Sequence, residues 1–129
     1  MDHLIDTNVL IHFLEDHPRL SKRMVGWIED PSARSHVSLV SLWEISIKAG
    51  IGKLHVSYAD RPDLPDLLEK SGFILLPIGW QAIRRAGGLP MHHRDPFDRL
   101  IVAEAQLRGL PVLSFDAQLD AYGIQRFDA

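Results

Sequence analysis

The sequence predicts an α/β sandwich with a mostly parallel sheet. Short apolar runs alternate with segments of helical periodicity along the whole chain, which is typical of strand-helix-strand units joined by right-handed crossovers. In residues 4–11 an apolar run ends at Asp6, and the apolar residues then recur at helical spacing. We therefore expect Asp6 at the carboxyl end of a central strand, the edge at which parallel sheets bind ligands.

Composition limits the class of protein. The 129 residues, 46% of them hydrophobic and 24% charged, fit one globular domain over residues 1–129. Cysteine is absent, which excludes disulfides and thiolate zinc sites. A net charge of −3 offers no general attraction to nucleic acid, so binding of nucleic acid would need a local site, a bound metal or a second chain.

The hydropathy pattern favours a cytoplasmic protein with no membrane segment. No apolar run approaches the ~20 residues that a membrane span needs. The first residues lack the basic and apolar regions of a signal peptide.

Proline, glycine and capping residues predict where each element begins and ends. Thr7 or Asn8 can cap the first helix, and Ser41 with Glu44 three positions on is the capping-box pattern of a later one. In the first part of the chain we expect a strand ending at Asp6, helices over 7–14 and 20–30, a strand over 35–39, a helix over 41–50, a loop over 52–63 and a helix over 65–70. In the second part we expect a strand over 73–78 covered on both faces, a helix over 80–86, a loop over 87–94, helices over 95–108 and 116–122 around a strand over 111–114, and an edge strand over 124–127.

Four carboxylates stand at comparable places in these elements, and each has an ordinary alternative explanation. Asp6 and Asp116 follow apolar strands, where they could be turn or capping residues. Glu44 and Asp98 lie near the starts of helices, where an acid is favourable in itself, and Glu44 could also complete the capping box or pair with Lys48. Glu44 and Asp98 nevertheless share helical stripes with apolar residues, so we expect them to point inward.

As a group these acids predict a cation site. Carboxylates that converge at one sheet edge repel one another and raise each other's pKa unless a cation lies among them. Oxygen ligands favour Mg²⁺ or Mn²⁺. Such a site suits phosphoryl transfer, because the metal lowers the pKa of a bound water and screens the phosphodiester charge, so that no side-chain nucleophile is required.

An ordered set of motifs resembles the PIN-domain nucleases, and in particular the VapC-type toxins of bacterial type II toxin-antitoxin pairs. No single tetrapeptide is specific, but the order and spacing of the set are, and the likeness runs over essentially the whole chain. The segments that carry it are Ile5-Asp6-Thr7-Asn8, residues 41–48 around Glu44, residues 52–54, Asp95-Pro96-Phe97-Asp98 with its continuation to residue 105, and residues 112–116.

The resemblance implies a PIN-like three-layer sandwich with a central five-stranded sheet in the order 3-2-1-4-5, and a Mg²⁺- or Mn²⁺-dependent endoribonuclease. A metal-activated water held in an acidic pocket would attack an RNA phosphodiester in line and leave a 5′-phosphate and a 3′-hydroxyl. By position, Asp6, Glu44 and Asp98 match the three core metal-site acids, and Asp116 matches the fourth. The residues that would support them are Thr7, Asn8 and Ser114, with Asp95 a helix cap first and a site residue second. The resemblance also implies a VapB-like antitoxin and a homodimer as partners, besides the RNA substrate.

Other conspicuous residues have two interpretations each. Four cationic side chains could contact RNA phosphates or be solvated surface charges: Lys48, Lys53, Arg94 and Arg99. We expect His92 and His93 on the loop surface rather than as metal ligands. We expect core packing for most of Trp27, Trp43 and Trp80, although PIN toxins also present apolar grooves to an antitoxin helix and to a second copy of themselves.

Three other functions compete with a nuclease. A receiver-type signalling domain also binds magnesium with aspartates, but it needs a lysine after a late strand, and Lys70 is the last lysine here. A phosphatase with Asp6 as its nucleophile usually has a second aspartate two positions on, where this chain has Asn8. A non-catalytic PIN-like module that binds RNA or a partner remains the main alternative, and only an assay separates it from a nuclease.

Overall fold

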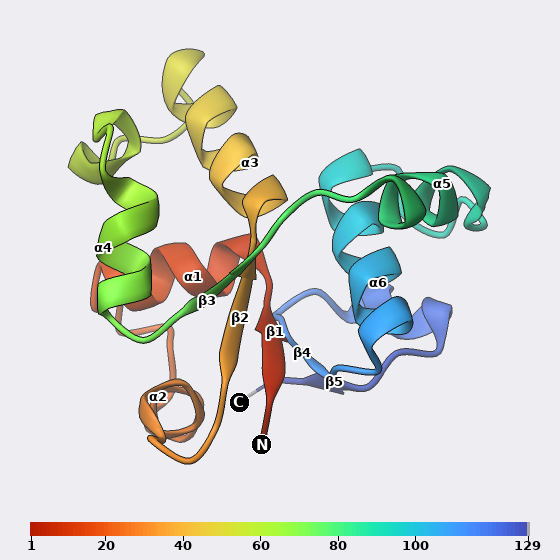
Figure 1. Ribbon diagram of the computed structural model, residues 1–129, viewed down its shortest axis with the longest axis horizontal. Coiled ribbons are helices and arrows are strands. Elements are labelled where there is room, and N and C mark those ends of the chain that lie inside the picture. Colours follow the sequence, from red (N-terminus) through yellow and green to blue (C-terminus); the bar gives the residue numbers. More distant parts are fainter. Residues whose placement is uncertain (129) are drawn as a thin grey trace.

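The structure is a computed structural model that describes residues 1–128. Its five strands form one sheet in the order β3-β2-β1-β4-β5, with every neighbouring pair parallel (Figure 1). The strands are β1 (His3–Ile5), β2 (Ser35–Ser38), β3 (Ile74–Leu76), β4 (Val112–Leu113) and β5 (Arg126–Phe127). The α/β class, the five strands and their order are confirmed.

Helices cover both faces of the sheet. They are α1 (Thr7–Leu14), α2 (Lys22–Glu29), α3 (Leu39–Gly50), α4 (Leu64–Lys70), α5 (Trp80–Gly88) and α6 (Pro96–Arg108), with 3₁₀ turns η1 (Ser57–Asp60) and η2 (Ala117–Tyr122). Helices α1, α2 and α4 lie on one side of the sheet and α5 and α6 on the other, while α3 continues upward from the end of β2 (Figure 1). Within residues 1–128 no helix is long and apolar enough to cross a membrane.

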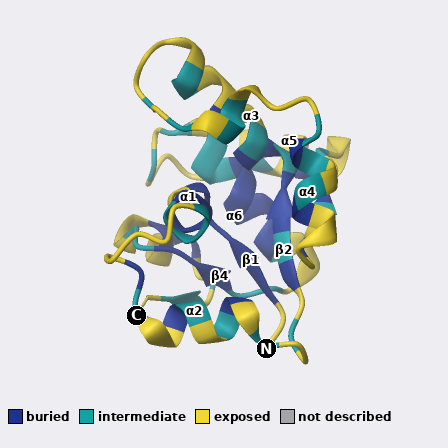
Figure 2. Cartoon of the chain, turned by 90° about the vertical axis from the view of Figure 1, so that its left-hand side faces the viewer, coloured by how far each residue is buried: buried dark blue, intermediate teal, exposed yellow. Residues whose placement is uncertain are grey.

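The core follows from the alternation of side chains along the two central strands. Ile5 and Leu113 pack with α1, α2 and α4 on one face, whereas Leu4 and Val112 pack with α5 and α6 on the other. All four side chains are fully buried, and the strands that carry them run through the centre of the molecule in Figure 2. Asp6 follows the buried apolar pair Leu4 and Ile5 directly and lies at the carboxyl end of β1.

Helix α6 begins and ends as its sequence predicts. The Asp95 side chain accepts a hydrogen bond from the Phe97 amide, and Pro96 occupies the first helical position. Gly109 ends the helix with a φ of 65°, in the left-handed region that favours glycine. The helix start holds Asp98 at the carboxyl edge of the sheet.

We predict that Gly109→Ala destabilises the protein by about 1 kcal/mol through backbone conformation alone. A Cβ at position 109 would meet no atom within 4 Å, so steric contact adds nothing to this cost. Chemical denaturation of the wild type and the variant measures the difference. Gly87→Ala is the control, because it is a helical glycine with equal space for a Cβ and should not lose stability.

Several expectations about local structure are wrong. Helix α3 begins at Leu39 with Ser38 as its cap, so Ser41 lies inside the helix and forms no capping box with Glu44. Helix α1 is capped by Asp6 itself, not by Thr7 or Asn8. Both errors have one cause: each helix starts directly at the end of its strand, with no intervening turn.

Some residues that were expected to be buried are exposed. Strand β3 is an edge strand, and its first residue, Ile74, is 37% exposed, so the expected cover on both faces is wrong. Trp43 and Trp80 are 55% and 71% exposed, which contradicts core packing for these two residues. Trp27 is half-buried and its ring contacts that of Phe127. The expected loop over 52–63 contains the 3₁₀ turn η1.

Candidate metal centre at the carboxyl edge of the sheet

The fold brings the four predicted acids to one edge of the sheet. Asp6 follows β1, Asp116 follows β4 by three residues, Glu44 lies in the second turn of α3, and Asp98 lies in the first turn of α6. Asp6 and Glu44 are 4% and 3% exposed, whereas Asp98 and Asp116 are half-buried. The charges of Asp6, Glu44 and Asp116 all act on Asp98, which places the group in one electrostatic environment.

Asp6 is held in a fixed orientation. One carboxylate oxygen accepts from the Thr7 amide at 2.8 Å, and the other accepts from the Ser114 hydroxyl at 2.6 Å. The Ser114 oxygen in turn accepts from the Asp116 amide at 3.0 Å, so Ser114 links the segment after β4 to Asp6. Burial raises the pKa of Asp6, and the neighbouring charges of Glu44 and Asp116 add to the rise, although the two hydrogen bonds oppose it.

Glu44 has one satisfied oxygen and one orphan. Its Oε2 accepts from Lys48 Nζ one helical turn on. Its Oε1 is buried and has no hydrogen-bond partner. An unsatisfied buried carboxylate oxygen costs free energy, and a cation in the site would supply the missing partner. The possible donors are the oxygens of four carboxylates, and oxygen donors of this kind fit a hard divalent cation.

Asp98 shows that the site has an excess of negative charge. Burial first, and then the charges of Asp6, Asp95, Glu44 and Asp116, raise the pKa of Asp98 to about 8. A carboxyl group with such a pKa is largely protonated at neutral pH unless positive charge is added. The residues present therefore fit Mg²⁺ or Mn²⁺, whose charge would keep all four acids ionised.

His93 belongs to this site, and its expected place on the loop surface is wrong. Its side chain is only 13% exposed, with Nε2 at 2.7 Å from Asp116 Oδ2 and 3.1 Å from Asp98 Oδ2. One ligand atom from each of these three residues lies within 4.8 Å of the other two. One feature of the sequence could have predicted this position. His93 stands two positions before Asp95, the N-cap of α6, and therefore lies near the first turn of that helix.

The expected supporting residues differ in their placement. Ser114 contacts an acid directly, whereas the Thr7 hydroxyl donates to Ser41 Oγ at 2.9 Å and contacts no carboxylate. The Asn8 side chain is exposed and makes no hydrogen bond within residues 1–128. Asp95 caps α6 and adds negative charge near Asp98.

The cationic residues divide in the same way. Lys48 donates a hydrogen bond to Glu44. Burial alone would lower the pKa of Lys48, but this hydrogen bond and the negative charge of Glu44 raise it. Arg99 donates to the carbonyls of Ala86 and Leu89 at 2.7 and 3.1 Å, which ties α6 to the end of α5 and does not favour a role in RNA binding. Lys53 and Arg94 are exposed.

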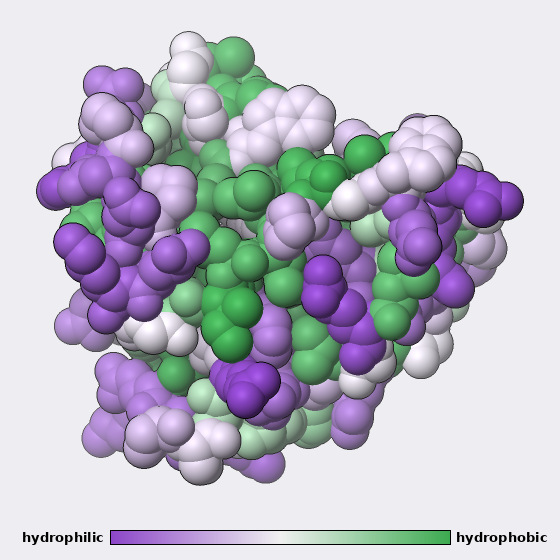
Figure 3. Space-filling model, viewed as in Figure 1, coloured by the Kyte–Doolittle hydropathy of each residue, from purple (hydrophilic) through white to green (hydrophobic). Residues whose placement is uncertain are grey.

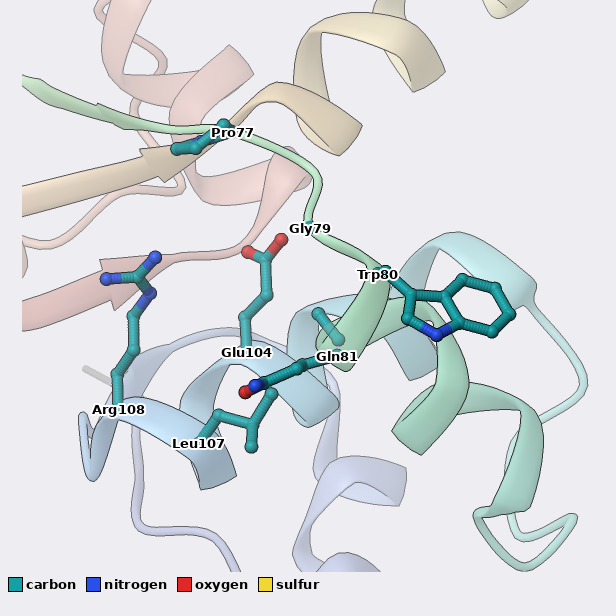
Figure 4. Close-up of a pocket in the computed structure, with 8 residues that line it drawn as sticks. Pro77, Gly79, Trp80, Gln81, Glu104, Leu107 and Arg108 are labelled. Carbon is teal, nitrogen blue, oxygen red and sulfur yellow. The ribbon is translucent and has the colours of Figure 1, made fainter.

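A cavity of about 440 Å³ lies apart from this edge, farther along α6 (Figure 4). It contains Glu104, a buried acid that the sequence analysis did not single out, although it lies one turn after the buried Leu100 and Ile101. Glu104 Oε1 accepts from Ser38 Oγ at 3.0 Å, while its Oε2 is buried without a partner. Burial raises the pKa of Glu104 to about 7. Glu104 lies six positions after Asp98 on the same helix, which places it about 9 Å along the axis from the acidic site.

Comparison with known proteins agrees with this architecture. The PIN domain family model matches residues 3–125, and no curated protein matches the chain. The crystal structure of VapBC2 from Rickettsia felis bound to a DNA fragment from their promoter contains a similar chain, with a TM-score of 0.72 and 14% identity over 99% of this chain and 98% of that one. For VapBC-1 from nontypeable Haemophilus influenzae the TM-score is 0.68 and the identity 19%, over 99% of this chain and 98% of that one. For FitAcB from Neisseria gonorrhoeae the values are 0.66 and 22%, over 98% and 96%.

The three structures share the fold of this chain at low sequence identity, and the family model covers nearly its whole length. The resemblance noted in the sequence is thereby confirmed at the level of the family. The chain belongs to the PIN-domain family.

Proposed function

We propose that this protein is a VapC-like toxin, a divalent-metal-dependent endoribonuclease that hydrolyses RNA phosphodiester bonds. The observation that carries the proposal is the buried Glu44 Oε1 without a donor, beside three further carboxylates at the carboxyl edge of a PIN fold. Asp6, Glu44, Asp98 and Asp116 would hold Mg²⁺ or Mn²⁺. When bound, the cation supplies water activation and screening of the phosphodiester charge.

The residues of the chain orient this chemistry. Ser114 and the Thr7 amide hold both oxygens of Asp6, so that the carboxylate needs no reorganisation when a ligand arrives. Lys48 keeps one oxygen of Glu44 engaged and leaves the other free. Lys53 and Arg94 are the exposed cations that we propose as phosphate contacts. With a net charge of −3, binding of RNA would depend on such local contacts and on the cation.

We propose an antitoxin of the VapB kind and a second copy of the chain as partners. The similar structures include a toxin-antitoxin complex from Klebsiella pneumoniae and a member of the VapBC family of toxin-antitoxin systems from Mycobacterium tuberculosis. An apolar cavity of about 410 Å³ is available between α3, α5 and α6, lined among others by Trp43, Ile83 and Phe97. Apolar side chains gather on this face of the molecule (Figure 3). Such a groove suits the apolar face of a partner helix.

The test is cleavage of a panel of structured and unstructured RNAs by the purified chain, with Mg²⁺, with Mn²⁺ and with chelator. We expect cutting that requires the metal and disappears in an identically prepared Asp6→Asn variant that remains folded. Equal cutting by both preparations would identify a contaminating nuclease. Metal binding without cutting of any RNA would favour the non-catalytic PIN-like module.

We also predict that Ser114→Ala lowers the affinity for Mn²⁺ by roughly tenfold, the usual effect of removing a hydrogen bond to a metal ligand. The variant loses the donor to Asp6 and the acceptor of the Asp116 amide. Isothermal titration calorimetry measures the affinity. The control is Ser46→Ala, at an exposed position of α3, which should leave the affinity for Mn²⁺ unchanged. An unchanged affinity in Ser114→Ala would show that Ser114 does not orient Asp6.

A further inference from the structure

The loop that carries His93 is anchored to the domain at two points. The His93 amide donates to the Tyr122 hydroxyl at 2.9 Å, and this hydroxyl donates to the Pro90 carbonyl at 2.7 Å. Tyr122 belongs to η2 and is 9% exposed. The loop is therefore clamped at two points by a buried side chain from another element, and the position of His93 is a built feature of the fold.

The hydrogen bonds of the imidazole ring identify its tautomer. The Asp95 amide donates to His93 Nδ1 at 3.1 Å. Because an amide N–H needs an acceptor, Nδ1 carries the lone pair and the ring proton is on Nε2. Nε2 is then a donor. Its nearer acceptor is Asp116 Oδ2 at 2.7 Å, and Asp98 Oδ2 lies farther away at 3.1 Å.

This tautomer decides between two roles for His93. A histidine that binds a metal through Nε2 needs its lone pair there and its proton on Nδ1. In this chain a proton on Nδ1 would face the backbone N–H of Asp95. Two hydrogen-bond donors would then point at each other, which is unfavourable. The backbone at the start of α6 thus disfavours ligation and favours donation.

We propose that His93 is a positioning residue of the acidic site, which donates its Nε2 proton to Asp116 and so holds that carboxylate beside Asp98. The inference rests on the function proposed above. Asp116 needs this support because its side chain is 32% exposed, whereas that of Asp98 is 15% exposed. Its Oδ1 accepts from the Gln118 amide at 2.9 Å, so His93 completes the restraint by holding Oδ2. The remaining lone pairs of both oxygens stay free for a cation.

The first test is nitrogen NMR of the histidine side chains, with the His93 signals assigned by their loss in His93→Gln. We expect the Nε2–H tautomer in the metal-free protein and the same tautomer after addition of Mg²⁺. A proton on Nδ1, or a loss of the Nε2 proton when Mg²⁺ binds, would overturn the proposal in favour of direct ligation.

The second test compares three substitutions by calorimetric titration with Mn²⁺. The amide nitrogen of His93→Gln can reach the place of Nε2, whereas that of His93→Asn reaches only the place of Nδ1. We expect the asparagine and alanine variants to lose roughly tenfold in affinity and the glutamine variant to stay within about twofold of the wild type. His55→Gln, on an exposed imidazole between α3 and η1, is the control, and thermal unfolding checks that each variant is folded.

Two outcomes contradict the proposal. Tighter Mn²⁺ binding by His93→Ala would show that the imidazole obstructs the cation, and equal losses in the glutamine and alanine variants would show that donation to Asp116 is not its role. Both tests are independent of RNA cleavage. A wild type that binds Mn²⁺ and shows the expected pattern, yet cuts no RNA, would refute the proposed nuclease function and leave the role of His93 standing.

Discussion

Asp98→Asn should abolish RNA cleavage and at the same time stabilise the metal-free protein. In the function proposed above Asp98 is a charged metal ligand, and loss of such a ligand removes several kcal/mol of transition-state stabilisation, so we expect the rate to fall by roughly a thousandfold or more. The pKa of Asp98 is about 8 in the folded protein, against the ordinary value of 3.8. The folded state therefore keeps a proton that the unfolded chain has released, and the free energy of unfolding decreases as the pH rises from about 4 to about 8.

Asparagine removes this decrease, because it has no charge at any pH. In chelator at pH 8 we expect the variant to be more stable than the wild type by about 2–4 kcal/mol, less the small loss of a favourable helix-dipole contact. Below about pH 3 the two proteins should be equally stable, because Asp98 is then protonated in both the folded and the unfolded state. Addition of Mn²⁺ should stabilise the wild type by binding to its folded state and the variant much less.

The matched control is Asp66→Asn, which removes an exposed aspartate from the first turn of α4 and should change neither property. Chemical denaturation across pH, with and without Mn²⁺, measures the stabilities, and single-turnover cleavage measures the rate. A variant that is less stable than the wild type at pH 8 in chelator would show that Asp98 is not under electrostatic strain.

Local rules were sufficient to predict where the acids gather. An apolar run that ends in an aspartate, and an Asp-Pro pair that opens a helix, are short-range signals, and they placed Asp6 and Asp98 at one edge of a parallel sheet. The same rules predicted Ser41 as the cap of α3, because Ser41 and Glu44 match the capping-box pattern, whereas the cap is Ser38, three residues earlier.

Residues whose role depends on distant partners could not be predicted in this way. His93 reaches the acids because Tyr122, 29 residues later, holds its loop. Arg99 turns away from the surface because the carbonyls of Ala86 and Leu89 lie within its reach. Trp43 has helical spacing with apolar residues, but α5 and α6 leave an open groove beside it, so it contacts Phe97 and stays 55% exposed. In each case the packing of a second element decides the outcome, and sequence periodicity holds no information about that element.

Glu104 gives the second large prediction, in which stability changes while activity does not. Burial raises the pKa of Glu104 to about 7 from an ordinary 4.5. Its charge is therefore disfavoured in the folded state, and the free energy of unfolding falls as the pH rises through this interval. Glu104→Gln should be more stable than the wild type by about 1–3 kcal/mol at pH 8, the range allowing for an amide nitrogen that meets no acceptor in place of Oε2.

At about pH 3 the advantage should disappear, since Glu104 is then protonated in both the folded and the unfolded state. The glutamine oxygen can still accept from Ser38 Oγ, so the start of α3 should stay in place. Chemical denaturation at several pH values measures the effect, with Glu69→Gln on the exposed face of α4 as the control. RNA cleavage by Glu104→Gln should equal that of the wild type, because this cavity lies apart from the acidic site. If cleavage were lost while stability rose, the acid would act in the reaction through α6, and the separation of the two sites would be wrong.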